Sequence, residues 1–162
     1  MYIKAIMIIH ICGPPASGKT TLGHKLANHF SWNPKVVVQD LDDLYHKWVK
    51  LRQGDYLQYI ARFIARHRKK FIIFVGLNMI PGAVSVPFDL GADHKFYISV
   101  QLNILVKRHF LREVAGWTSW MAERDHEILY HQLVQSQRSV TVDLTNSLTR
   151  VLDIEAQSKM IS

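Results

Sequence analysis

The stretch Gly13-Pro14-Pro15-Ala16-Ser17-Gly18-Lys19-Thr20 has the pattern G-x-x-x-x-G-K-T, which is typical of a phosphate-binding loop. An apolar run, Ile6–Cys12, precedes it, and a helix-compatible stretch, Thr21–Phe30, follows it. The two glycines allow a tight turn in which several backbone N–H groups point at one anion, and the following helix adds its own N–H groups and positive dipole end. This strand–loop–helix context predicts an anion site at residues 13–20.

Each side chain of the loop has an expected role. Lys19 is a mobile cation that can reach the outer phosphates of a nucleotide, and the hydroxyl of Thr20 is an expected Mg²⁺ ligand. The other loop residues expected to contact the nucleotide are Gly13, Ala16, Ser17, Gly18 and Thr21.

The composition indicates a globular protein with one core. The chain has 162 residues, of which 48% are apolar and 20% charged, so we expect a single domain over residues 1–162. The one cysteine, Cys12, cannot form an internal disulfide, which fits a reducing compartment, and we expect it to be a buried packing residue. No stretch approaches the ~20 apolar residues of a membrane span, so we expect a soluble cytoplasmic protein without a membrane partner.

Short apolar strands alternate with helical stretches along the chain, which predicts an α/β fold with a parallel sheet between two layers of helices. The expected strands are Ile3–Cys12, Val36–Gln39, Phe71–Val75, Lys95–Val100 and Val140–Leu144. The expected helices are Thr20–Phe30, Leu41–His67 with a break near Gly54-Asp55, Asn103–Ala115, Ser119–Gln137 and Ser147–Ala156. The stretch Leu77–His94 is too long for a plain loop, so we expect it to be functional or to contain a short element.

An acidic cluster follows the second expected strand. Ligands in open α/β sheets bind at the carboxyl ends of the strands, where Asp40, Asp42 and Asp43 lie. We expect Asp40 to help hold Mg²⁺ and Asp40 or Asp42 to accept a proton from an attacking hydroxyl. The alternative is that Asp42 and Asp43 only stabilise the start of the next helix.

Two arginines lie on one face of the helix expected after the fourth strand. Arg108 and Arg112 are four residues apart, and arginines that close over phosphates stabilise the charge that develops during phosphoryl transfer. We expect both to act in catalysis, and Arg108 also to bind the nucleotide. Arg124 is a weaker candidate, and residues 113–125 are expected to form a short lid.

The formal charge of +7 favours anionic partners, and nucleotides and nucleic acids both satisfy it. The basic run at Arg62, Arg66 and 67–70 has two interpretations: a solvated helix end, which we favour, or a contact surface for a phosphate backbone. Trp117 and Trp120 have two interpretations as well, packing under the lid or stacking on a base. The pair His126 and His131 is spaced by five, so it lacks the four-residue spacing of a zinc-protease helix.

Taken together, these features resemble small P-loop kinases that act on nucleosides and nucleotides. Residues 39–47, Gln-Asp-Leu-Asp-Asp-Leu-Tyr-His-Lys, resemble the Q-D-x-F-Y-K stretch of uridine kinase and nicotinamide riboside kinase, and Phe74-Val75-Gly76-Leu77 resembles their F-E-G-hydrophobic strand end. The stretches 88–90 and 93–98 are similar to the part of those kinases before the fourth strand. Asp143-Leu144-Thr145-Asn146 resembles the D-x-T/N turn near the adenine of nucleoside monophosphate kinases, which implies nucleotide binding by Asn146.

The resemblance implies a five-stranded sheet in the order 2-3-1-4-5, with ATP as phosphate donor and Mg²⁺ as cofactor. It predicts a kinase that transfers the γ-phosphate to a small acceptor, with a nucleoside or nucleotide as the expected one. One position departs from the family, because its Mg²⁺-associated glutamate falls on Val75. Two alternatives stay open: a polynucleotide 5′-hydroxyl kinase, and a nucleotide-binding module without catalysis.

Overall fold

The structure is a computed structural model of the chain. It describes residues 7–13, 17–52, 54–76, 78–80, 86–88, 90–98, 100–101, 104, 140–142 and 149–156. The strands in these ranges are β1 (Met7–Cys12), β2 (Val36–Asp40), β3 (Phe71–Val75), β4 (Met79–Ile80), β5 (Val86–Pro87), β6 (His94–Ile98) and β7 (Val140–Val142). The helices are α1 (Lys19–His29), α2 (Leu41–Leu51), α3 (Tyr56–Arg66) and a helix over residues 149–156.

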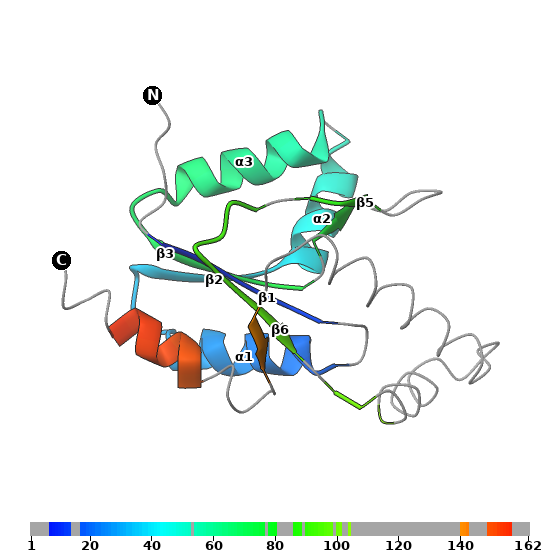
Figure 1. Cartoon of the computed structure of the whole chain (residues 1–162). Helices are drawn as coiled ribbons and strands as arrows, with labels where there is room; N and C mark the ends of the chain where they lie inside the picture. Colours follow the sequence, from blue (N-terminus) through cyan, green and yellow to red (C-terminus); the bar gives the residue numbers. More distant parts are fainter. Residues whose placement is uncertain are drawn as a thin grey trace.

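A parallel sheet forms the centre of the fold, as the near-continuous apolar strands predicted. β2, β3, β1 and β6 lie side by side in that order, which confirms the predicted order 2-3-1-4 of the first four strands. β7 adds three residues in parallel register beside β6. Figure 1 shows α2 and α3 above the sheet and α1 with the helix over residues 149–156 below it.

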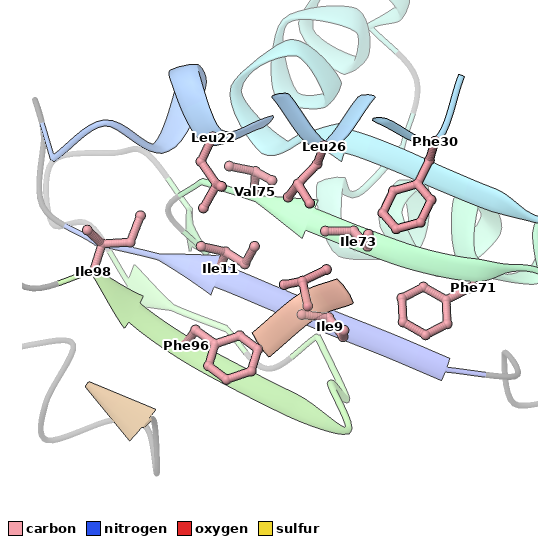
Figure 2. Packing of buried hydrophobic residues seen from close by; sticks show 11 residues of the cluster. Ile9, Ile11, Leu22, Leu26, Phe30, Phe71, Ile73, Val75, Phe96 and Ile98 are labelled. Carbon is pink, nitrogen blue, oxygen red and sulfur yellow. The ribbon is translucent and has the colours of Figure 1, made fainter. Parts of the chain in front are cut away.

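Each face of the sheet has its own apolar cluster, because successive strand residues point to opposite faces. On one face Leu22 and Leu26 of α1 pack against Ile9, Ile11 and the residues around them, as Figure 2 shows. On the other face β1 and β3 contribute Ile8, Ile72 and Phe74, which pack against α2 and α3. Burying both faces explains why β3, with the sequence FIIFV, contains no polar residue.

The predicted break in the second helix is confirmed. α2 ends at Leu51, Arg52 adopts a left-handed conformation (φ 47°), and α3 starts at Tyr56. The carboxylate of Asp55 caps α3 by accepting a hydrogen bond of 3.0 Å from the N–H of Leu57. α2 and α3 therefore form a helical hairpin over one face of the sheet.

The stretch after β3 contains the short element that its length suggested. β4 and β5 pair antiparallel as a two-stranded sheet of their own. Asn78 and Phe88 flank this pair, where the N–H of Phe88 donates to the carbonyl of Asn78 at 2.9 Å. Phe88 and Leu90 are buried against the α2–α3 face, so this segment extends the core.

Several predicted boundaries shift by one or two residues. β2 includes Asp40, α1 starts at Lys19 and not at Thr20, and β6 covers 94–98 where 95–100 was predicted. The predicted helices Asn103–Ala115 and Ser119–Gln137 lie outside the described residues apart from Ile104, and residues 3–6 of the predicted first strand lie outside them as well. None of the helices in the described ranges is long and apolar enough to cross a membrane.

Candidate functional site

The predicted phosphate loop starts at the carboxyl end of β1 with a close approach of backbone and side chain. A Cβ added to Gly13 would lie 2.8 Å from the Oγ of Ser17 and 3.2 Å from the carbonyl oxygen of Ile98. Such distances exclude any larger residue without a shift of the loop. Ser17 is buried, and its Oγ has no hydrogen-bond partner within the part of the chain that the structure describes. A buried hydroxyl of this kind usually has a partner, and a polar ligand bound at the loop would supply one.

α1 begins with the geometry that an anion site needs. Gly18 is the residue before the helix and has φ 98°, a left-handed conformation that favours glycine. Among the residues that the structure describes, no side chain caps the helix, and its first turn contains no acidic residue. The first amides of a helix lack partners within the helix, so those of Thr20 and Thr21 are positioned to donate to a bound phosphate.

Lys19 lies across the loop. Its Nζ donates a hydrogen bond of 2.8 Å to the carbonyl oxygen of Gly13, so the ammonium group is held over the turn. Thr20 and Thr21 are exposed at the start of α1. The four predicted loop residues Gly13, Ser17, Gly18 and Lys19 thus lie close together between the end of β1 and the start of α1.

Asp40 ends β2 and caps α2 at the same time. Its backbone is extended (φ −73°, ψ 129°), while its Oδ1 accepts hydrogen bonds from the N–H groups of Asp42 (2.8 Å) and Asp43 (3.2 Å). The sequence left open that Asp42 and Asp43 only stabilise the start of α2. The side chain that caps this helix is that of Asp40, and Asp42 and Asp43 contribute their backbone N–H groups. Neither capping bond uses Oδ2.

Burial raises the pKa of Asp40 above its ordinary value, although the hydrogen bond from Asp43 N–H acts in the opposite direction. The nearby charges of Asp42 and Asp43 also raise it. A carboxylate with a raised pKa accepts a proton more readily, which suits a general base. Asp42 and Asp43 themselves are exposed on the first turn of α2.

Strand register places these groups at one edge of the sheet. Asp40 is paired with Val75, and Val75 is paired with Ile11, so β2, β3 and β1 end together. With neighbouring strands ~4.8 Å apart, the backbone of Asp40 lies about 10 Å from that of β1. The acidic end of β2 and the start of the phosphate loop therefore face the same side of the molecule.

Val75 occupies the position at which the resemblance places a glutamate. Its side chain is fully buried and lies under α1, where a Cβ on Gly23 would meet it at 3.6 Å. Gly23 is three residues after Thr20, so Val75 packs close to the predicted metal ligand without offering an oxygen. Within the described ranges, no group of three or more His, Cys, Asp or Glu side chains is arranged to hold a metal.

Sequence reasoning overlooked two residues that shape this edge. Gly76 follows β3 with φ 129°, and a Cβ there would lie 3.2 Å from the Cβ of Leu41. His10 is buried in β1 and its ring Nε2 lies 2.8 Å from the carbonyl oxygen of Gly76, so Nε2 carries the proton and donates. A lone histidine inside an apolar strand was the signal available in the sequence.

Aromatic rings stand beside the acidic cluster. Tyr45 and Trp48 of α2 contact Tyr56 of α3 with ring centroids 5.3 Å from it, and Tyr56 contacts Phe88 at 5.8 Å. Burial raises the pKa of Tyr56, and the charge of Asp42 adds to this effect. Asp42 and Tyr45 are three residues apart on α2, so they occupy neighbouring positions on one face of that helix.

Cys12 is buried, as predicted. Burial raises the pKa of its thiol to about 11, while the charges of Lys19 and Lys95 act in the opposite direction. A protonated thiol at neutral pH agrees with a buried packing residue.

Other predicted site residues lie outside the described residues. They are Ala16 of the loop, Arg108 and Arg112, Asn146, the weaker candidate Arg124, and Trp117 and Trp120 with the lid expected at 113–125. Their roles remain predictions from the sequence.

Comparison with known proteins identifies the fold. No family model matches the sequence, and no curated protein matches it. The crystal structure of a gluconokinase from Sinorhizobium meliloti 1021 superposes with a TM-score of 0.51 at 15% identity, covering 98% of this chain and 97% of that one. An uncharacterized protein from Eubacterium ventriosum ATCC 27560 superposes with a TM-score of 0.52 at 12% identity, covering 91% of this chain and 97% of that one. At such identities the likeness shows a shared fold, and that fold is one that a kinase also adopts.

Proposed function

We propose that the protein is an ATP-dependent phosphotransferase that moves the γ-phosphate of ATP to a small-molecule acceptor, with a nucleoside or nucleotide as the expected acceptor. One observation carries the proposal. The turn between β1 and α1 combines a left-handed Gly18, a helix start without a side-chain cap and the Lys19 ammonium group. These are the features that bind a polyphosphate chain.

This loop binds the phosphate donor. The amides that open α1 donate to phosphate oxygens, and the Nζ of Lys19 exchanges its bond to the carbonyl of Gly13 for one to the outer phosphates. The sequence adds Ala16 and Asn146 to nucleotide binding, and Arg108 and Arg112 as the cations that close over the transferring group.

The described residues fit a Mg²⁺ ion bound together with the nucleotide. Mg²⁺ in kinases is held by one or two protein oxygens, by phosphates and by water, so it needs no cluster of three protein ligands. The exposed hydroxyl of Thr20 and the Oδ2 of Asp40 are the oxygens available for it. When bound, Mg²⁺ neutralises charge on the phosphates. The alternative of a module without catalysis rests on Val75, which contributes no oxygen.

The start of α2 binds the acceptor and takes up its proton. Asp40, with its raised pKa, or the exposed Asp42 accepts the proton of the attacking hydroxyl. The partly exposed rings of Tyr45 and Trp48, on the same helix as Asp42, support an acceptor that contains a ring, and the buried ring of Tyr56 packs beneath them.

The replacement Asp40→Asn tests the catalytic assignment. Asparagine caps helices as well as aspartate, so α2 stays capped while the charge and the base are lost. We expect transfer to fall by at least about a hundredfold, the lower range for loss of a general base, with ATP binding retained. The matched control is Asp43→Asn, in the same exposed helical turn. Unchanged turnover in Asp40→Asn would remove this residue from the mechanism.

A panel of acceptors tests the substrate class. ADP release from Mg-ATP is measured with nucleosides, nucleotides, small polyols, gluconate and a 5′-hydroxyl oligonucleotide. Gluconate is included because one structural neighbour is a gluconokinase. We expect turnover with a nucleoside or nucleotide. Turnover only with the oligonucleotide would favour a polynucleotide kinase, and ATP binding without turnover for any acceptor would favour a module without catalysis.

A further inference from the structure

A groove on the outer side of the α2–α3 hairpin has no part in the proposed reaction. It has a volume of about 460 Å³ and is lined by Leu51, Tyr59, Arg62, Ala65, Arg66 and Arg68. The residues of α3 that face the sheet are a different set, Tyr56, Ile60 and Phe63. The groove therefore lies on the side of α3 that faces solvent.

The groove is strongly basic. Arg62, Arg66 and Arg68 are exposed, and no hydrogen bond or ion pair within the described part of the chain engages their guanidinium groups. No aspartate or glutamate occurs in the sequence from residue 56 to residue 88. Three positive charges thus share one concave surface without a carboxylate from α3 or β3 to offset them.

The floor of the groove is apolar and partly aromatic. Leu51 is 54% exposed, and the ring of Tyr59 is half-buried, packed on one side against the core. Arginine guanidinium groups pair with phosphates and stack on planar rings, and an exposed tyrosine ring stacks on a base. Phosphate contacts around a surface for stacking are the combination that single-stranded nucleic acid requires.

The groove also lies away from the phosphate loop. α3 ends at Arg66, and Arg68 lies three residues before the first residue of β3, so these arginines lie near the amino end of that strand. The phosphate loop and Asp40 are at the carboxyl ends of the strands. A strand of five residues spans about 15 Å, which separates the two edges of the sheet.

We propose that this groove binds single-stranded nucleic acid, with Arg62, Arg66 and Arg68 on the phosphates and Tyr59 stacked on a base. Charge complementarity selects an anionic partner, and the aromatic floor favours nucleic acid over an acidic peptide. This binding is additional to phosphoryl transfer to a small molecule and uses none of its residues.

Fluorescence anisotropy with a labelled 12-mer of deoxythymidine tests the proposal between 50 and 200 mM salt. The triple variant Arg62→Ala/Arg66→Ala/Arg68→Ala is expected to weaken binding by at least about tenfold. It should also lower the slope of log K against log salt by about 2, since each phosphate contact on a single strand contributes about 0.7. The control Lys25→Ala/Lys35→Ala/Arg150→Ala removes the same charge from exposed positions that do not line the groove.

Equal loss of affinity in the two triple variants would overturn the proposal, because it would show a general effect of charge. An absence of binding by the unmodified protein at 50 mM salt would overturn it as well. If a glutamate 12-mer or a DNA duplex binds as tightly as the single strand, the groove does not select single-stranded nucleic acid and the proposed partner is wrong. Tyr59→Phe should keep the affinity for the single strand, and Tyr59→Leu should lower it. Equal affinities of these two variants would show that Tyr59 does not stack on a base.

Discussion

Gly13 is the residue at which the phosphate loop has least room. A methyl group there would lie 2.8 Å from the Oγ of buried Ser17 and 3.2 Å from the Cβ of Ile98. We expect Gly13→Ala to lower the free energy of unfolding by about 1–3 kcal/mol, the usual effect of overpacking, and to weaken ATP binding by at least about tenfold. Urea unfolding and calorimetric titration measure the two effects.

Gly23 provides the matched control for this change. It lies within α1, and a methyl group there would meet Val75 at 3.6 Å, an ordinary contact. Gly23→Ala should therefore raise the free energy of unfolding by up to about 1 kcal/mol, the difference in helix propensity, and leave ATP affinity unchanged. Equal effects of the two substitutions would show that the crowding at Gly13 does not matter.

Asp40 predicts a dependence of stability on pH. Its pKa in the folded protein is raised by burial, so the folded state holds the proton more tightly than the unfolded state does. Relative to Asp40→Asn, the wild-type protein should therefore gain stability as the pH falls from 7 through the raised pKa toward the ordinary value of 3.8. The difference in Tm between the two proteins at pH 7 and pH 4 measures this gain.

Asp42→Asn is the control for that experiment, since Asp42 is exposed and caps no helix. If the difference in Tm between wild type and Asp40→Asn does not change with pH, or changes as it does for Asp42→Asn, the burial of the Asp40 carboxylate does not perturb its titration. Its proposed role as a base would then lose the support of a raised pKa.

The Asp40 side chain also shows the limit of sequence reasoning at this scale. Its place at the end of β2 was predictable from the apolar run Val36–Val38 and the acidic residues that follow. Its double role was not predictable, because Asp40 is both the last residue of the extended strand and the residue whose side chain caps α2. Sequence patterns assign a residue to a strand or to a helix cap, whereas the φ and ψ of Asp40 satisfy both.

At the scale of elements, the α2–α3 hairpin depends on the cap at Asp55. The carboxylate of Asp55 accepts a hydrogen bond from the N–H of Leu57. The residue before it, Gly54, has a left-handed conformation, so α3 begins directly after a turn and depends on this cap. Asp55→Ala should cost about 1 kcal/mol of the free energy of unfolding, the usual value for a lost cap. Gln58→Ala, at an exposed site on the same helix, should change it by less than about 0.5 kcal/mol. Similar losses in urea unfolding would contradict a role of the cap.

Elements were predictable to different degrees for a physical reason. β3 was predicted to the residue because FIIFV is an uninterrupted apolar run with basic residues before it and Gly76 after it. β4 and β5 were not predicted, since each has two residues and no periodicity can be read from so short a segment. Their pairing depends on Asn78 and Phe88, which are ten residues apart, and on burial of Phe88 against α2 and α3.

At the scale of the whole molecule, the topology brings three sequence-distant groups to one edge of the sheet. The phosphate loop follows β1, Asp40 ends β2, and Gly76 follows β3. The N–H of Gly76 donates a hydrogen bond of 2.9 Å to the carbonyl of Ile11. The order of β2, β3, β1 and β6 was inferable from a family resemblance, whereas the spacing of motifs along the chain left it undetermined. The hydrogen bond from His10 to Gly76 was beyond prediction, because it depends on the register of two strands.

The central claim is that residues 13–20 bind the phosphates of a nucleotide, and calorimetric titration of Mg-ATP tests it most directly. Three proteins are compared: wild type, Lys19→Ala, and Lys25→Ala, which removes an exposed lysine farther along α1. We expect binding to wild type and to Lys25→Ala with the same affinity, and binding at least about tenfold weaker to Lys19→Ala, because a charge-assisted contact to a phosphate is lost. Equal affinities of the three proteins, or no binding to any of them, would contradict the claim.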